Sequence, residues 1–536
     1  MNSLRSLIAA IICTAGVCAC GGGSSGSGSS ATAQSGTPLV IANVKDATML
    51  DPSMASDGIS LNATYEVLEN LVAFKPGSFT IVPELAQKWN VSGDGRTWTF
   101  TLRPNAKFSD GTPADADAVK FNFDRWRLVS DPAHGNFTYV YYPDVFGGFP
   151  GKIADVRAKD PRTVVFTLTS PDGPFLRDIA EPAFGIGSPA AIRKDPQAFQ
   201  RKPVGSGPYL LAEWVRDDHI TLQANPTYDG PGAKPTIPTV IIRDIPDQAT
   251  SVLSVEKGDI QMLAAPRPDD AKALAKNPAV VVAEQPPNNT AYMAMNMEKK
   301  PFNDLRVRRA IAYALDLPAI VHGLYSSSAV VADNWTPQAI VGNNPSVHIY
   351  PHDIAKAKAL LAQAGLANGF STDLFYPTAP RPYMPEPQRL AETIQAQLRT
   401  IGISVTLQPY EFGVFLDKVR NGEHQMALIG WSGDNGDPDN FFYPLLDQDS
   451  AHKGTAQNYS FWRDPAFHQL MIEGQLTTDE AKRKLIYQQA NAMVHDQVPA
   501  ISIVHTAVPM IVSANVAGYV PSPDTEYHFE TMSFKK

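Results

Sequence analysis

Cysteine is almost missing from this sequence of 536 residues. Its three cysteines, Cys13, Cys18 and Cys20, all fall within the first 20 residues. The chain beyond them therefore has no thiolate nucleophile, no disulfide and no cysteine-ligated metal.

Long runs of one charge are also lacking. The chain has 45 Lys and Arg residues against 54 Asp and Glu residues, a formal net charge of −9, and no long basic stretch. Because nucleic-acid-binding surfaces are strongly basic, we expect no nucleic-acid partner. The 43% hydrophobic and 18% charged residues are typical of a soluble globular protein, and the length favours about two to four domains.

Signatures of catalysis are missing too. The sequence has no HExxH, no GxSxG and no phosphate-binding loop. Ser254 and Lys257 fit an SxxK pattern, but neither SDN nor KTG accompanies them, so a solvated helix end is the better interpretation. We expect no catalytic residue, no metal and no cofactor, and we do not predict an enzyme.

The N-terminus has the pattern of an export signal. Arg5 precedes a short apolar stretch, Leu7 to Val17, which is too short to span a membrane. The sequence from Val17 to Cys20 resembles the lipobox of bacterial lipoproteins, in which the last Cys is lipidated. We therefore predict a signal peptide over 1–20, lipidation of Cys20 and a Gly/Ser-rich tether over 21–36. A plain secretory signal remains the alternative.

The rest of the chain alternates strand and helix patterns. Trp98, Phe100 and Leu102 alternate with threonines after an Asp94-Gly95 turn signal, which predicts a two-faced strand pair. The range 236–265 reads strand, helix, strand, an order typical of parallel strands in an α/β fold. A second α/β body is predicted to begin near Ala291. After a last helix over 479–494, we predict that 499–513 is one strand returning to the first body.

The range 430–442, GWSGDNGDPDNFF, is the best candidate for a ligand-binding loop. An apolar run of strand length ends there, and three carboxylates follow within six positions, flanked by aromatic residues. Such a loop can hold a cation or an ammonium group. The carboxylates are Asp434, Asp437 and Asp439.

Two other interpretations of this loop compete with ligand binding. Asp and Asn in Gly/Pro-rich loops often bond to their own backbone in Asx-turns, which is an equally good interpretation of Asp437 and Asp439. A calcium loop fits poorly, because the position expected to be Gly is Asp439 and the position expected to be a bidentate Glu is Leu445.

Several motifs together resemble the peptide-type, family 5 extracytoplasmic solute-binding proteins of bacterial ABC importers. They are PELAQKW, DGRTWTFTLRPNAKFSDGTPADADAV, GSGPY, NDLRVRRAIAYALD, DIAKAKALLAQAG and GWSGDNGDPDNFF. The resemblance implies a two-lobed, type II periplasmic-binding-protein fold of the α/β class, with an extra inserted domain and a ligand cleft between the lobes. It implies these ranges: 37–68, 200–285 and 500–536 for lobe I, 69–199 for the inserted domain, and 286–499 for lobe III.

The resemblance also implies ligand-binding residues. Asp434 matches the carboxylate that binds a peptide α-amino group, and Arg381 matches the guanidinium that binds the C-terminal carboxylate. Such roles suit a desolvated carboxylate and a planar bidentate fork. Their neighbours in the site are Tyr383, Trp431, Ser432 and Gly433. Ser56 corresponds to a hydroxyl residue on the opposite lobe, where the match is weak.

The function implied is a receptor that captures dipeptides outside the cytoplasmic membrane and delivers them to an ABC permease. A periplasmic monomer, anchored to the lipid bilayer through its N-terminus, is expected. Members of the family also bind oligopeptides, haem, glutathione, nickel or sugars, so another small solute is the main alternative. A peptide hydrolase is the alternative from a different class.

Overall fold

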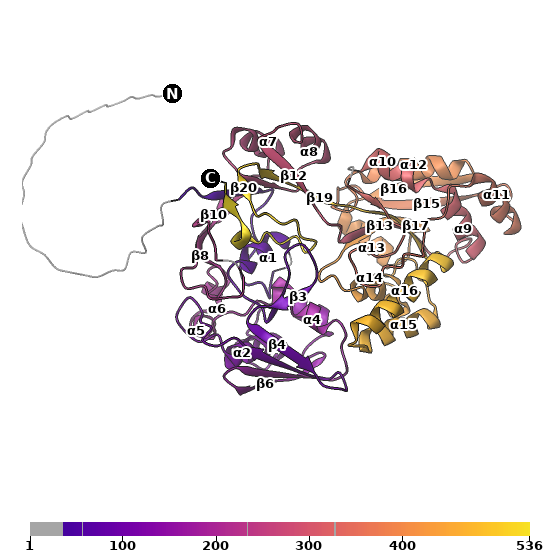
Figure 1. Cartoon of the computed structure of the whole chain (residues 1–536). Helices are drawn as coiled ribbons and strands as arrows, with labels where there is room; N and C mark the ends of the chain where they lie inside the picture. The colour runs from indigo at the N-terminus through magenta and orange to yellow at the C-terminus, as the bar shows by residue number, and fades with distance from the viewer. Residues whose placement is uncertain (1–35, 56, 233, 326–327, 536) are drawn as a thin grey trace, which may run out of the picture. The chain divides into compact units, whose positions relative to one another are not determined.

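Two large mixed sheets and a four-stranded antiparallel sheet form the frame of the computed structural model (Figure 1), which describes residues 36–535 apart from 56, 233, 326 and 327. Cys20 and Ser56, with the predicted signal segment 1–20, lie outside the described residues. None of the described helices combines the length and the apolar character needed to cross a bilayer.

The first large sheet has seven strands in the order β12-β19-β11-β1-β10-β9-β8. At its centre, β1 (Leu39–Asn43) runs parallel to β10 (Thr239–Asp244) and to β11 (Met262–Ala264). Helix α7 (Gln248–Lys257) connects β10 to β11, and α8 (Pro268–Leu274) leads on to β12 (Val280–Gln285). The parallel α/β arrangement predicted for 236–265 is therefore confirmed. The antiparallel strands β8 (Tyr209–Val215), β9 (His219–Ala224) and β19 (Val508–Ser513) complete the sheet.

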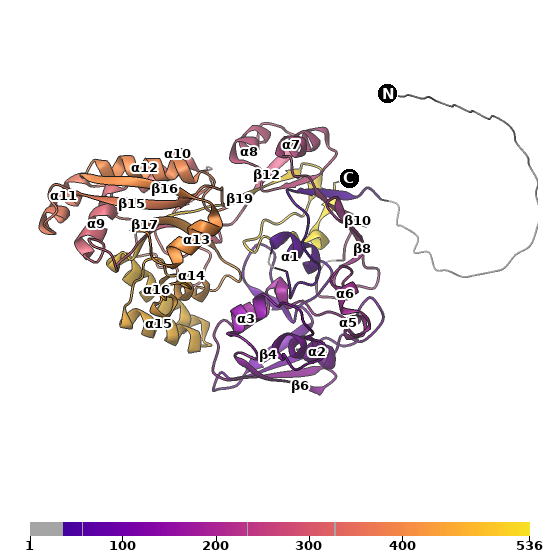
Figure 2. The ribbon, with the colours of Figure 1, turned by 180° about the vertical axis from the view of Figure 1, so that it is seen from behind.

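The second large sheet has six strands in the order β14-β18-β13-β17-β15-β16. Strand β15 (Phe370–Pro377) is parallel to both β16 (Ile403–Tyr410) and β17 (Met426–Ser432). Helix α12 (Pro387–Arg399) connects β15 to β16, and α13 (Phe412–Arg420) connects β16 to β17. These two helices lie on opposite faces of the sheet (Figures 1 and 2). The remaining strands are β13 (Asn289–Met295), β14 (Val330–Val331) and β18 (Ala500–His505).

The helices of this second body form where their apolar residues repeat at helical spacing. In α12, Leu390, Ile394 and Leu398 recur every four residues and are buried against the sheet. Helix α9 (Leu305–Ala314) begins at Asp304, whose side chain accepts a hydrogen bond from the Arg306 backbone N–H. The other helices here are α10 (Leu317–Leu324), α11 (Ile354–Gln363), α14 (Asp439–Leu446), α15 (Pro465–Leu476) and α16 (Glu480–Gln497).

The prediction of a single strand over 499–513 is wrong. Strand β18 pairs with β13 in the six-stranded sheet, whereas β19 pairs with β11 and β12 in the seven-stranded sheet. Between them the backbone N–H and carbonyl of Thr506 both bond to the Asn289 side chain at 2.9 Å, which turns the chain from one sheet to the other. Residues 500–505 therefore lie with the second body, and not with lobe I as the range 500–536 predicts.

A four-stranded antiparallel sheet in the order β4-β5-β7-β6 falls within 69–199, the range that we call the inserted domain. Its strands are β4 (Ala86–Val91), β5 (Thr97–Leu102), β6 (Ile153–Asp160) and β7 (Thr163–Leu168). The predicted alternation is confirmed, because Trp98, Phe100 and Leu102 are buried between less buried threonines. Each such side chain contributes about 1.5–3 kcal/mol when fully buried. The helices of this range include α2 (Ala116–Arg127), α3 (Tyr141–Phe146) and α4 (Phe175–Asp178).

Candidate functional site

The candidate site lies at the carboxyl ends of two neighbouring parallel strands. Strand β17 leads into the Asp434 loop, and β15 leads into the segment that contains Arg381. The connections leaving these strands run to opposite sides of the sheet, since β15 continues to β16 whereas β17 continues towards β18 beyond β13. In α/β sheets such a point of divergence forms a crevice where ligands bind. The two predicted charges thus emerge at the same edge of one sheet.

The predicted passage from a buried strand to a polar loop is confirmed. Strand β17 is buried from Met426 to Gly430, Trp431 is half-buried and Ser432 is exposed. Gly433 lies so close to its surroundings that an added Cβ would stand 2.6 Å from Asn288 Oδ1 and from the Phe441 ring. Its backbone N–H donates to the Asn288 carbonyl at 2.7 Å, which fixes the start of the loop.

Asp434 is an exposed carboxylate with a neutral partner. Asn440 Nδ2 donates to Asp434 Oδ2 at 3.0 Å, and the Oδ1 atom of the same Asn440 accepts from Trp431 Nε1 at 2.8 Å. Surrounding protein atoms displace part of its hydration, which raises the pKa of Asp434 to about 6, and the nearby Asp144 carboxylate adds to the rise. Within the described ranges Asp434 forms no ion pair.

Asp437 and Asp439 have structural roles instead. Asp437 is fully buried and binds the Arg483 guanidinium with both oxygens, at 2.6 and 2.8 Å. Burial raises the pKa of Asp437, but the positive charge of Arg483 and its hydrogen bonds outweigh that effect, so the pKa of Asp437 lies below its usual value. Asp437 Oδ1 also accepts from the Asp439 backbone N–H at 2.9 Å, as in an Asx-turn. Asp439 accepts from Gln475 and from the Tyr487 hydroxyl.

Arg381 has no carboxylate partner among the residues that the structure describes. Its guanidinium lies over the Phe412 ring, with Cζ 3.3 Å from the ring centroid, and its Nε is buried without a hydrogen-bond acceptor. The backbone groups of Arg381 and Met384 bond to each other at 2.8 and 3.0 Å, which makes this segment a tight turn. The guanidinium is thus held in place but is not neutralised.

Tyr383 connects the Arg381 turn to β17. Its ring packs on Gly430, where an added Cβ would stand 2.3 Å from the ring. Burial raises the pKa of the Tyr383 phenol to about 12, although the Arg381 charge acts in the opposite direction. Of the predicted site residues, Tyr383 therefore packs on Gly430 just before Trp431, and Trp431 and Asp434 are joined through hydrogen bonds to the same Asn440 side chain.

Sequence reasoning missed the part of the site that comes from the inserted domain. The negative charge of Asp434 adds to the effect of burial in raising the pKa values of Tyr141 in α3 and Glu181 just after α4. Asn435, the residue after Asp434, bonds to Asp178 and Glu181. No local pattern signals these contacts, because more than 250 residues separate Asn435 from its partners.

One further group has the composition of metal ligands: Asp447, Asp449 and His468. Its polar atoms have partners in the chain, since Asp447 accepts from His468 Nδ1 at 3.0 Å and from the Asp449 backbone N–H at 2.9 Å. The Tyr443 hydroxyl donates to Asp449 at 3.2 Å. Hydrogen bonding within the chain accounts for this group.

The chain passes between two α/β bodies at two adjacent points, near Asn289 and near Thr506, and the second body carries unmatched charges at one edge of its sheet. This arrangement is typical of binding proteins of the periplasmic type. Residues 80–453 match the family model of bacterial extracellular solute-binding proteins, family 5 (middle). The chain belongs to this family, and it has the two-lobed type II periplasmic-binding-protein fold that the sequence predicted. It is a solute-binding protein.

Its relatives include receptors for different solutes. The chain is 37% identical over 500 residues to the dipeptide-binding protein of Escherichia coli (strain K12), across 90% of this chain and 92% of that protein. It is 34% identical over 498 residues to heme-binding protein A of Haemophilus influenzae, across 90% of each. The solved structure of HbpA2 from Haemophilus parasuis matches with a TM-score of 0.87 and 32% identity, across 93% of this chain and all of that chain.

Proposed function

We propose that this solute-binding protein captures dipeptides by their two charged ends and delivers them to an ABC permease. The observation that carries the proposal is the pair of unmatched opposite charges at one sheet edge. Asp434 has only an amide as partner, and Arg381 has no carboxylate within the described residues. A dipeptide supplies one ammonium and one carboxylate, which are the two missing partners.

The chemistry of each side chain suits its end of the ligand. Arg381 offers a planar fork that holds a carboxylate through two parallel hydrogen bonds, and its ring stacking on Phe412 orients that fork. The carboxylate of Asp434 accepts charge-assisted bonds from an ammonium. Tyr383, Trp431, Ser432 and Gly433 complete the proposed wall on this lobe, and Ser56 is proposed to contribute from the other lobe.

The similarity to a dipeptide-binding protein supports the same choice. Haem is the rival solute, because a relative of similar identity is named for heme binding. Haem carries two carboxylates and no ammonium, so it would use Arg381 but would leave Asp434 without a partner. The pair of opposite charges therefore favours the peptide.

The location and the domain boundaries are part of the proposal. We place the protein in the periplasm as a monomer, anchored to the membrane by a lipidated Cys20. Lobe I is proposed to comprise 37–68, 200–285 and the C-terminal segment, whose start moves from residue 500 to about Thr506 because β18 pairs in the other sheet. The inserted domain stays at 69–199.

Mass spectrometry of the solute that co-purifies with the protein tests this function. The protein is purified without added ligand, denatured in acid, and the released small molecules are identified. We expect a mixture of dipeptides, and their hydrolysis products should stay absent on long incubation. Release of haem, visible by its absorption in the native protein, or of a non-peptide solute would overturn the dipeptide assignment.

A further inference from the structure

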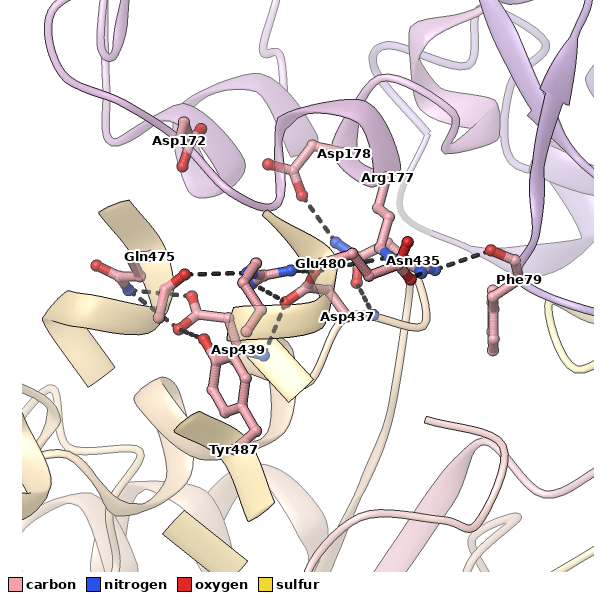
Figure 3. Close-up of polar contacts among 12 residues, drawn as sticks. Phe79, Asp172, Arg177, Asp178, Asn435, Asp437, Asp439, Gln475, Glu480 and Tyr487 are labelled. Atoms are coloured by element: carbon pink, nitrogen blue, oxygen red, sulfur yellow. Dashed lines mark hydrogen bonds and ion pairs between the residues drawn. The ribbon is translucent and has the colours of Figure 1, made fainter. Parts of the chain in front are cut away.

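The inserted domain contacts the second body through a buried polar interface (Figure 3). Arg177 in α4 donates from Nη2 to Glu480 of the second body at 3.0 Å, and its Nη1 donates to the Phe79 carbonyl of its own domain at 2.8 Å. The Gly173 backbone N–H donates to the Gln475 carbonyl at 2.7 Å. The Arg177–Glu480 and Gly173–Gln475 contacts join segments that lie about 300 residues apart in the sequence.

Asn435 lies at the centre of this interface. Its Nδ2 atom donates to Asp178 Oδ1 at 2.8 Å and to Glu181 Oε1 at 3.1 Å, while its Oδ1 accepts from the Asp437 backbone N–H at 3.0 Å. Asn435, Asp178 and Glu181 are each no more than 5% exposed. The Asn435 carboxamide thus bonds to two carboxyl groups of the inserted domain, those of Asp178 and Glu181, and to its own loop.

Position 435 requires an uncharged side chain that donates hydrogen bonds, because it faces the carboxyl groups of Asp178 and Glu181. Burial raises the pKa of both Asp178 and Glu181 well above the usual value, and neighbouring carboxylates add to the rise. The charged groups facing Asp178 are Asp172, Lys152, Asp437 and Asp439, and those facing Glu181 are Asp434 and Asp178. A carboxylate in place of the Asn435 amide would add a like charge and would remove both donated hydrogens.

The loop places Asn435 directly after Asp434. Asp434 is exposed, Asn435 is buried against the inserted domain, and Gly436 packs on Phe79 so closely that an added Cβ would stand 2.1 Å from that ring. Gly436 also has a φ of +65°, a conformation that other residues adopt at a cost. The inserted domain therefore fixes the loop immediately beyond the carboxylate of Asp434.

We infer that Asn435 is a positioning residue, through which the inserted domain holds Asp434 in the geometry that binds the ligand ammonium. This inference rests on the proposed function, since it takes Asp434 as the ammonium-binding group. Ligand capture then depends on the contacts of Asn435 with Asp178 and Glu181 of the inserted domain.

The test compares Asn435→Asp, which removes the amide donor, with a triple variant in which Asp178 and Glu181 become amide donors and restore the hydrogen bonds. Asn435→Asp should weaken binding of Ala-Ala by about tenfold or more at about pH 7.5, measured by calorimetry. Adding Asp178→Asn and Glu181→Gln to that variant returns amide donors opposite the new carboxylate. The triple variant should bind Ala-Ala to within about threefold of the natural protein. Asn303→Asp adds the same charge at an exposed position and should have no effect.

The outcomes distinguish the proposed ammonium-binding role of Asp434 from the positioning role of Asn435. If Asp434→Ala binds Ala-Ala as tightly as the natural protein does, the proposed site is wrong. If Asp434→Ala weakens binding while Asn435→Asp does not, or if the triple variant stays as weak as Asn435→Asp, the positioning role is wrong. Should Asn435→Asp fail to fold, as shown by circular dichroism, the double variant Asp178→Ala/Glu181→Ala replaces it. It must also weaken binding, and unchanged binding would refute the inference.

Discussion

Asp434→Ala and Asp437→Ala should affect different properties of the protein, ligand affinity in the first case and stability in the second, although the two residues are only three positions apart. Asp437 is buried and its two oxygens bind Arg483 at 2.6 and 2.8 Å. Asp434 is exposed and accepts from the neutral Asn440. We therefore expect Asp437→Ala to lower the free energy of unfolding and Asp434→Ala to lower ligand affinity.

The magnitudes follow from what each substitution leaves unpaired. Removing one partner of a buried ion pair costs about 3–5 kcal/mol, because Arg483 stays buried without a counter-charge. Replacing an exposed side chain that makes no ion pair changes the unfolding free energy by about 0.5 kcal/mol or less. Loss of Asp434 leaves the ligand ammonium unpaired in the complex, at a cost of about 2–5 kcal/mol. Affinity should then fall by about 30-fold to several thousand-fold.

Two measurements on the same protein preparations check this. Urea unfolding of the ligand-free variants gives the stability, and calorimetric titration with Ala-Ala gives the affinity. Asp417→Ala, which removes an exposed carboxylate from α13, is the matched control and should change neither quantity. The reasoning would be refuted if Asp434→Ala unfolded as easily as Asp437→Ala while keeping its affinity. It would also be refuted if Asp437→Ala lost more affinity than Asp434→Ala with no loss of stability.

Three further predictions concern pH, the carboxylate end and the anchor. The pKa of Asp434 is about 6 without ligand, and a bound ammonium lowers it, so affinity should be constant above about pH 6 and fall up to about tenfold per unit below it. Titration between about pH 5 and 8 checks this, and Asp434→Asn should lose the dependence. Arg381→Lys keeps the charge but loses the planar fork, so calorimetry should show affinity reduced by about tenfold or more; an unchanged affinity would remove the bidentate role. Cys20→Ala should release the protein from membranes in cell fractionation, because lipid chains provide the anchor; equal retention would contradict lipidation.

Local patterns in the sequence were enough to predict much of the fold. The alternation of Trp98, Phe100 and Leu102 with threonines predicted β5, and the strand, helix, strand order of 236–265 predicted the parallel part of the seven-stranded sheet. The pattern failed over 499–513, where an almost continuous apolar run contains two strands of different sheets. The crossing point depends on contacts that the local pattern does not contain, such as the bonds between Thr506 and Asn289, which are 217 residues apart.

The loop that carries the candidate site could be predicted from the sequence, but the structural role of Asp437 could not be distinguished there from the role proposed for Asp434. The end of β17 and the following acidic loop were predicted correctly. Asp434 and Asp437 look alike in the sequence, and Arg483, which distinguishes them, lies 46 residues from Asp437. Asn435 is an ordinary loop residue by its local pattern. Its proposed positioning role rests on hydrogen bonds to Asp178 and Glu181 in another domain, and such long-range contacts leave no local signal.

The most direct test of capture by two charged ends is to titrate the protein with four peptides: Ala-Ala, Ala-Phe, Ala-Ala-Ala and N-acetyl-Ala-Ala. Each added residue lengthens an extended peptide by about 3.3–3.6 Å, more than a hydrogen bond can stretch, so a tripeptide cannot reach both Asp434 and Arg381. Acetylation removes the ammonium. Water can fill space around different side chains, so side-chain identity should matter less.

We predict that Ala-Ala and Ala-Phe bind within about tenfold of each other, while Ala-Ala-Ala and N-acetyl-Ala-Ala bind far more weakly. Equal binding of the acetylated peptide would contradict the role of Asp434, and strong binding of the tripeptide would contradict a site that fits two residues.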